Sequence, residues 1–266
     1  MNDITEIQWA HFDTEGYVIL GQVAPREMLD AMRQRIDTIM LGEADLNYDR
    51  MLMQLDSSDG SYESAGEQTR GYKGKTLNYR KIEQLEEDPI FLRYMQLPIF
   101  AQAARRIYGT VPVAAFRAMF MNKPAGRGTA LPLHQDHWRA LDIDPILTIY
   151  TALDAADLEN GCIELISGTH HTLLNPSHPS GFLTPEMAEP YRNDPRRIPL
   201  VLEAGEVVLM HNWTLHESGV NGSSRSRGAF SVCLMEASTM SLRYNRLAAR
   251  NIIFGEGALA IQNLSY

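Results

Sequence analysis

Residues 111–121, VPVAAFRAMFM, begin the part of the chain that decides the fold, because they form a short apolar run set off by turn residues. Comparable runs recur downstream, at 146–153, 162–166, 198–202, 207–211 and 229–235. Apolar runs of this length between turn-forming residues are typical of buried or half-buried β-strands. Several such strands at this spacing predict a β-sandwich or a β-barrel.

The chain before this β-rich part is predicted to be largely helical. Pro25 suits a first helical position, and an apolar stripe at three- and four-residue steps follows until Gly42: Met28, Leu29, Met32, Ile36, Ile39 and Met40. A further helix is expected over 88–108, with a break at Pro98. Residues 56–76 are polar and rich in Gly and Ser, which predicts a loop; a substrate lid is the alternative to a solvated connection.

Composition limits the class of protein and its partners. The 266 residues are 44% hydrophobic and 21% charged, as in soluble globular proteins, and they fit one domain. The net charge of −9 disfavours nucleic acid and acidic membrane surfaces, so a small-molecule partner is expected. The oligomeric state is not predicted.

Cysteine usage and the N-terminus predict a cytoplasmic protein. Cys162 and Cys233 both lie in apolar runs, so two buried thiols are expected rather than a disulfide. No apolar run of about 18 residues is present, and residues 1–6 are polar and acidic rather than signal-like.

The stretch Leu133-His134-Gln135-Asp136 carries the first chemical signal. On an extended strand the side chains of His134 and Asp136 project to the same side, while that of Gln135 points away. The best third metal donor is His216, on what should be another strand. Two histidines and one carboxylate on one face of an octahedral ion leave three positions open, as expected of iron(II) oxygenases and unlike a closed zinc site.

Arg227 follows His216 at the start of the last apolar run. A buried guanidinium is suited to hold a dicarboxylate by paired, planar hydrogen bonds. Ser218 lies on the same strand face as His216 and could donate to that carboxylate as well.

Together these segments resemble the phytanoyl-CoA dioxygenase family of iron(II)/2-oxoglutarate oxygenases. The matching segments are 134–136, 153–162, 167–170, 216–221 with Arg227, and the opening 12–20, which resembles the family's N-terminal strand. The family often has Pro-Gly-Ser-His where this chain has Ser167-Gly168-Thr169-His170, which alters a turn only.

The resemblance implies a mainly β fold with flanking α-helices, a double-stranded β-helix (jelly roll, cupin-like) of about eight strands. One domain would cover 1–266, with helical support over about 1–110 and the β-helix core over about 111–236. It also implies His134, Asp136 and His216 as Fe(II) ligands, and Arg227 with Ser218 as contacts to 2-oxoglutarate.

The implied activity is hydroxylation of a small organic substrate with O2, releasing succinate and CO2. Related halogenases carry a small residue at the carboxylate position, so Asp136 favours hydroxylation. The alternatives are a cupin-like metal-dependent isomerase or hydrolase and a non-catalytic binding jelly roll. Substrate-selecting residues are expected on loops such as 56–76 and 173–197, and the cluster Arg70, Lys73 and Lys75 hints at an anionic substrate, although a solvated basic face is the simpler interpretation.

Other polar and aromatic residues are weaker candidates. Trp138 could stack over cofactor or substrate, although packing explains it equally well. Thr148, Tyr150 and Arg139 could line a pocket, and Met119 and Met121 are expected to pack in the core. His211 is the nearest rival to His216 but lacks an arginine at the matching offset. His137 should point away from Asp136, and the remaining histidines are interpreted as surface or packing residues: His11, His170, His171 and His178.

Overall fold

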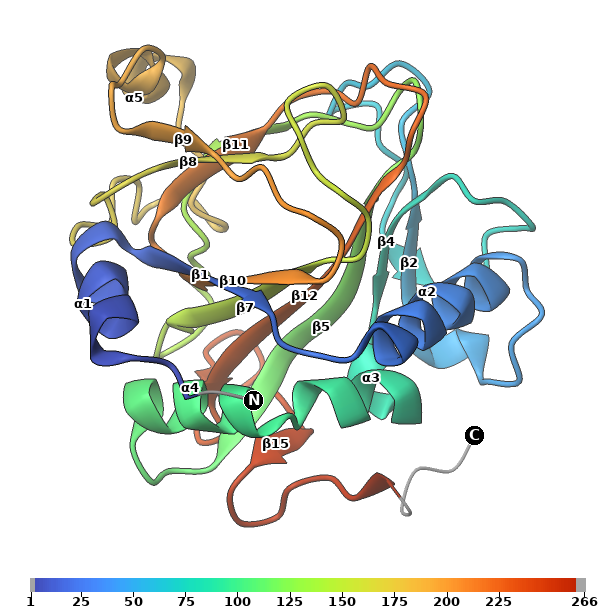
Figure 1. The fold of residues 1–266 in the computed structure, drawn as a ribbon, viewed down its shortest axis with the longest axis horizontal. Coiled ribbons are helices and arrows are strands. Elements are labelled where there is room, and N and C mark those ends of the chain that lie inside the picture. Colours follow the sequence, from blue (N-terminus) through green and yellow to red (C-terminus); the bar gives the residue numbers. More distant parts are fainter. Residues whose placement is uncertain (1–2, 262–266) are drawn as a thin grey trace.

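The computed structural model describes residues 3–261, and its centre is a pair of facing antiparallel sheets (Figure 1). The larger sheet contains β5 (Val113–Lys123), β7 (Leu147–Ala152), β10 (Glu206–His211) and β12 (Arg227–Glu236). The smaller sheet contains β6 (Leu131–His134), β8 (Ile163–Ile166), β9 (Arg197–Pro199) and β11 (Leu215–Ser218). From β5 to β12 the chain therefore crosses repeatedly between the sheets, and the predicted double-stranded β-helix is confirmed.

The large sheet is buried on both faces, which explains why its strands are continuous apolar runs in the sequence. Along β7, Leu147 and Ile149 pack with the helices on the outer face, while Tyr150 and Ala152 pack on the inner face toward the small sheet. All six residues of β7 are buried. A strand covered on both sides loses the apolar–polar alternation of a half-exposed strand.

The N-terminal helices cover the outer face of the large sheet. They are α1 (Glu6–Glu15), α2 (Arg26–Met40), α3 (Pro89–Met95) and α4 (Pro98–Tyr108) (Figure 1). The predicted helix after Pro25 is confirmed, and its apolar stripe is buried. The predicted break at Pro98 is also confirmed, because α3 and α4 each begin with a proline that lacks an N–H to donate.

Residues 1–110 contain strands as well as the expected helices. Strands β1 (Tyr17–Gln22), β2 (Leu52–Leu55) and β4 (Tyr79–Glu83) extend the large sheet at its two sides. The N-terminal strand also begins later than the matching segment 12–20 indicated. Phe12 still belongs to α1, which ends at Gly16 with φ at 81°, a left-handed conformation that favours glycine.

The remaining elements are short. Residues 56–76 are irregular as predicted, except for the two-residue strand β3 (Thr69–Arg70) paired with β2. The others are η1 (Tyr48–Arg50), η2 (Leu85–Glu87), α5 (Pro185–Ala188), η3 (Glu189–Tyr191), β13 (Met240–Ser241), β14 (Arg246–Leu247) and β15 (Ile252–Phe254). None of the helices found within residues 3–261 is long and apolar enough to cross a membrane. Both cysteines are buried and free.

Candidate metal centre

A cavity of about 1020 Å³, open to solvent, lies between the two sheets. It is lined by all seven of the side chains predicted to form the site: His134, Asp136, Trp138, Thr148, His216, Ser218 and Arg227. These side chains come from β6, β7, β11, β12 and the segment after β6. The fold therefore gathers residues from distant parts of the sequence around one concave space, as small-molecule sites do.

Three potential ligands meet at this cavity. Strands β6 and β11 pair with His134 opposite His216, and the centroids of the two imidazole rings are 4.2 Å apart. The Nε2 atom of His134 lies 3.8 Å from Oδ1 of Asp136. One ligand atom from each of His134, Asp136 and His216 lies within 4.8 Å of the other two. One ion could contact all three.

Asp136 reaches this position differently from the expectation. Strand β6 ends at His134, so Asp136 does not continue an extended strand. Its backbone N–H donates to the carbonyl of Asn212 at 2.7 Å, outside any strand pairing. Gln135 does point away as expected: it is fully buried, and its amide donates to the Trp213 carbonyl at 2.6 Å and to that of Thr172 at 2.9 Å.

The hydrogen bonds of the two histidines determine which ring nitrogen is free. Nδ1 of His134 lies 2.8 Å from the Pro132 carbonyl, and Nδ1 of His216 lies 2.9 Å from the Thr214 carbonyl. A carbonyl can only accept, so each Nδ1 carries a hydrogen and Nε2 is the nitrogen that remains for a metal. Burial and the neighbouring His216 lower the pKa of His134 well below its ordinary value, which favours its neutral form. An imidazole fixed through Nδ1 in this way is a typical metal ligand.

Arg227 and Ser218 lie next to this ligand set. Arg227 is only 3% exposed, and it donates to Tyr150 Oη at 2.8 Å and to the Gly161 carbonyl at 3.0 Å. Its buried Nε has no hydrogen-bond partner in the described part of the chain. Buried donors are rarely left unpaired in folded proteins. An anion beside Arg227 would satisfy this donor.

Thr148 has a supporting position. Its hydroxyl donates to Oδ1 of Asn212 at 2.7 Å, and Asn212 is itself the residue whose carbonyl accepts from Asp136. Asn212 is fixed further by a hydrogen bond from its Nδ2 to the Pro145 carbonyl at 2.9 Å. The hydrogen bond from Thr148 to Asn212 and the backbone hydrogen bond from Asp136 to Asn212 therefore hold Asp136 in place.

Several residues that line the cavity were not predicted from the sequence. Lys81, Arg117, Tyr62, Gln68 and Phe182 all line the cavity, and the ring of Phe182 stacks on that of His134 at 4.6 Å. A signal for Arg117 was present, because it interrupts an otherwise apolar strand.

The cavity lining bears on two further sequence interpretations. Met119 and Met121, interpreted as core residues, also line it. The basic residues Arg70, Lys73 and Lys75 do not, and Lys75 pairs with Glu43 at 2.8 Å instead.

The other histidines lie outside the cavity lining. His137 pairs with Asp144, and His211 accepts from the backbone N–H of Trp213 at 3.1 Å. Burial, together with His170 and His171, lowers the pKa of His211 to about 4. Arg139 is also outside and donates to the Ser177 carbonyl at 3.0 Å. His216 rather than His211 therefore lies beside the pair at 134 and 136.

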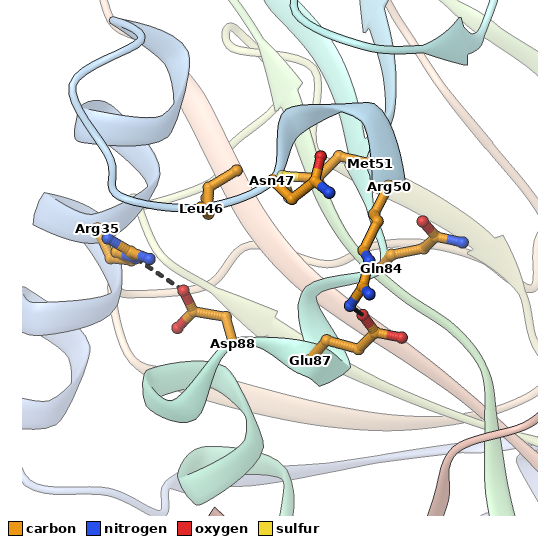
Figure 2. A pocket seen from close by; sticks show the side chains of 8 residues that line it. All are labelled: Arg35, Leu46, Asn47, Arg50, Met51, Gln84, Glu87 and Asp88. Atoms are coloured by element: carbon orange, nitrogen blue, oxygen red, sulfur yellow. Dashed lines mark hydrogen bonds and ion pairs between the residues drawn. The ribbon is translucent and has the colours of Figure 1, made fainter. Parts of the chain in front are cut away.

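Another cavity lies between α2, η1 and η2 (Figure 2). Its charged groups pair with each other: Arg35 with Asp88 at 2.7 Å and Arg50 with Glu87 at 3.7 Å. Its lining contains no histidine or cysteine. Within residues 3–261, the group of possible metal ligands is found in the cavity between the sheets and not in this one.

The chain is similar to known sequences. The chain is 25% identical over 232 residues to a Caenorhabditis elegans protein named probable phytanoyl-CoA dioxygenase, covering 83% of this chain and 72% of that protein. It is 30% identical over 161 residues to human peroxisomal phytanoyl-CoA dioxygenase, covering 57% of this chain. That match spans 47%, about half, of the human protein.

Solved structures share the fold. EctD from S. alaskensis, determined with 2-oxoglutarate and 5-hydroxyectoine, matches with a TM-score of 0.71 and 18% identity, covering 98% of this chain and 84% of that chain. The non-heme alpha ketoglutarate dependent epimerase SnoN from nogalamycin biosynthesis matches with a TM-score of 0.65 and 18% identity, covering 96% and 91%. The family model described as phytanoyl-CoA dioxygenase (PhyH) matches residues 12–229. The chain therefore belongs to the phytanoyl-CoA dioxygenase (PhyH) family.

Proposed function

We propose that this protein is an Fe(II)- and 2-oxoglutarate-dependent dioxygenase that hydroxylates a small organic substrate. The observation that carries the proposal is the meeting of His134, Asp136 and His216 in one cavity that also contains the buried, partly unpaired Arg227. Family membership and the names of the solved relatives support the same reaction class.

In this proposal His134, Asp136 and His216 hold the iron. The donor set fits, because it offers two neutral imidazole nitrogens and one carboxylate from one side of the ion and leaves other positions open. Backbone carbonyls fix both imidazoles through Nδ1, and Asn212 fixes Asp136 through its backbone. Ligands held by hydrogen bonds keep their geometry when the ion or its other ligands change.

Arg227 and Ser218 bind the carboxylate of 2-oxoglutarate that lies away from the metal. The Arg227 guanidinium and the Ser218 hydroxyl are the donors, and the hydrogen bond from Arg227 to Tyr150 fixes the guanidinium. Thr148 acts through Asn212 on Asp136, and Trp138 forms part of the cavity wall beside the substrate. Bound iron and 2-oxoglutarate supply the activation of O2, with one oxygen atom entering the substrate and the other entering succinate as CO2 leaves.

Hydroxylation is the proposed outcome because Asp136 fills a position that would have to be small to admit a halide. Epimerisation and ring formation share the cofactors, so the product must be measured directly. Met119 and Met210 add apolar surface to the cavity lining, where an apolar part of a substrate could pack.

The test is a two-stage experiment on the full-length protein. Without oxygen, 2-oxoglutarate added to the Fe(II) protein is expected to change its visible absorption. Candidate substrates are then screened with O2 for succinate release. The mass of each product is measured by mass spectrometry to detect the gain of one oxygen atom. His216→Ala should abolish both signals, whereas His171→Ala, a change at an exposed histidine, should retain them.

Iron binding without any response to 2-oxoglutarate would contradict the oxygenase proposal and favour a metal-dependent isomerase or hydrolase. Absence of metal binding would favour a binding protein that only shares the fold.

A further inference from the structure

One arginine in the cavity has no partner. Arg117 lies in the middle of β5 and lines the cavity on the same strand face as Met119 and Met121. A guanidinium has five N–H donors. Within residues 3–261, no hydrogen bond and no ion pair is formed by Arg117, whereas Arg227 uses two of its nitrogens.

Aromatic rings hold the guanidinium of Arg117 in place. Its Cζ lies 5.3 Å from the ring centroid of Trp138 and 5.3 Å from that of Phe116. These two rings pack edge to face with centroids 4.7 Å apart. Stacking of this kind fixes the plane of a guanidinium and leaves its N–H groups free to bind. Arg117 is therefore a positioned donor group rather than a loose surface charge.

Positive charge gathers in this part of the cavity, where Glu83 and Asp136 are the carboxylates that act on Lys81. Lys81 on β4 also lines the cavity and, in the part of the chain described, forms no hydrogen bond or ion pair. Burial and the charges of Arg80 and Arg117 lower its pKa to about 8. Of the carboxylates in the lining, Asp136 faces the metal position and Glu217 pairs with Arg197. Unpaired charges in a cavity favour a ligand of opposite sign.

Arg117 and Arg227 mark two separate positions. On paired strands β5 and β12, Arg227 lies opposite Lys123, and Arg117 lies opposite Cys233. The stretch from 117 to 123 spans about 20 Å at roughly 3.3 Å per residue. The two arginines thus start from backbone positions well separated along the cavity face, and each can receive its own anion.

We propose that the substrate is a small organic acid whose carboxylate binds Arg117, with its remainder lying along Met119 and Trp138 toward the metal ligands. This inference rests on the proposed function and narrows its substrate class. A planar guanidinium pairs with a carboxylate through two parallel hydrogen bonds, so Arg117 fixes both the end and the orientation of the substrate. A neutral amide of the same shape lacks the charge for this pairing.

The test compares matched acids and amides on the anaerobic Fe(II) protein saturated with 2-oxoglutarate, so that the position at Arg227 is filled. Benzoate and benzamide, and hexanoate and hexanamide, are titrated by calorimetry while the visible absorption reports that 2-oxoglutarate stays bound. At least one acid is expected to bind about 10- to 100-fold more tightly than its amide, the range of a charge-assisted hydrogen bond.

Variants assign the preference to one residue. Arg117→Gln should remove the preference for acids, Arg117→Lys should recover part of it, and Arg93→Gln, at an exposed position on α3, should retain it. Equal binding of acid and amide by the unmodified protein, or no binding of the acids, would overturn the inference without any variant.

The outcomes also separate the two proposals. A 2-oxoglutarate-dependent absorption change without acid preference leaves the oxygenase proposal standing and removes the acid substrate. If acid binding depends on Arg117 but 2-oxoglutarate causes no absorption change, the acid-binding site stands and the oxygenase proposal is removed.

Discussion

Arg225 and Arg227 lie two residues apart, yet their surroundings differ. The side chain of Arg225 is 50% exposed and pairs with Asp157 at 2.6 Å. Arg227 is buried in the cavity wall with Nε unpaired. An exposed ion pair contributes little to binding or stability, whereas a buried guanidinium forms strong, directional bonds to a carboxylate.

Arg227→Gln is therefore expected to weaken 2-oxoglutarate binding by about 10- to 100-fold, because one charge-assisted pairing is lost. Iron binding should change little, since Arg227 is not a ligand. Spectroscopic titration of the anaerobic protein measures both affinities. Arg225→Gln is the matched control and should bind 2-oxoglutarate normally; unchanged affinity in Arg227→Gln would remove that residue from the role.

The surroundings of Glu86 lead to a second prediction, which concerns how stability depends on pH. It is 8% exposed, its Oε1 accepts from Asn251 at 3.2 Å, and its Oε2 has no partner in the described chain. Burial, with a smaller contribution from Glu87 and Glu83, raises its pKa to about 7. The folded protein thus holds a proton on Glu86 at pH values where the unfolded chain has lost it.

Because the pKa is raised on folding, the free energy of unfolding should fall as pH rises from about 4.5 to about 7. Glu86→Gln keeps the shape and the acceptor for Asn251 but cannot ionise, so it should be more stable than the unmodified protein at pH 8 by roughly 1–3 kcal/mol. Urea unfolding at pH 5 and pH 8 measures the difference. Glu87→Gln, at a more exposed carboxylate, is the control; an identical pH dependence in Glu86→Gln would refute the prediction.

At the scale of elements, the strands that could be predicted from the sequence are those with apolar surroundings on both faces. Strands β5, β7, β10 and β12 are covered on both faces, so their apolar runs stand out. Strand β4 was missed because it reads Tyr-Arg-Lys-Ile-Glu. Of its charged residues, Lys81 lines the cavity, Arg80 donates to the buried Gln54 at 2.9 Å, and Glu83 is buried. Charge inside a fold is indistinguishable in sequence from charge on its surface.

The segment around Gly181 shows how a loop completes the metal centre. The Gly181 carbonyl accepts from the Gln135 N–H at 3.2 Å, and the next residue, Phe182, stacks on His134. Gly181 has φ at 70°, and a Cβ there would lie 2.0 Å from the Gln135 carbonyl oxygen. Only glycine allows this close approach of two backbones.

Gly181→Ala is expected to destabilise the protein by about 2 kcal/mol or more, because both the conformation and the contact oppose a side chain. It should also weaken metal binding, since Phe182 would move from the His134 ring. Thermal unfolding and metal titration measure the two effects. Gly222→Ala is the control, because a Cβ there meets nothing within 4 Å; equal behaviour of the two variants would show that the loop does not support the site.

At the scale of the whole molecule, the cavity depends on both sheets. The small sheet supplies His134 and His216, and the large sheet supplies Arg227 and Arg117. The sequence motif indicated the three residues that meet as possible metal ligands, since their spacing and residue types carry the signal. It did not indicate Arg117 or Lys81 as cavity residues, because their position depends on strand register between segments far apart in the chain.

A metal bound between elements of the native fold should stabilise the whole molecule. Ni(II) at roughly 100 times its dissociation constant is expected to add about 2.7 kcal/mol to the free energy of unfolding. For a chain of this size, that raises Tm by about 5–10 °C. His171→Ala should show the same increase and His216→Ala none. An increase that persists in His216→Ala would indicate a metal site elsewhere.

The central claim is that His134, Asp136 and His216 bind one ferrous ion. The most direct measurement is anomalous diffraction at the iron edge from crystals of the Fe(II) protein grown without oxygen. We predict one strong peak per chain, in contact with Nε2 of His134, Nε2 of His216 and the carboxylate of Asp136. A peak that contacts other residues, or a cavity without iron in crystals that contain it, would contradict the account.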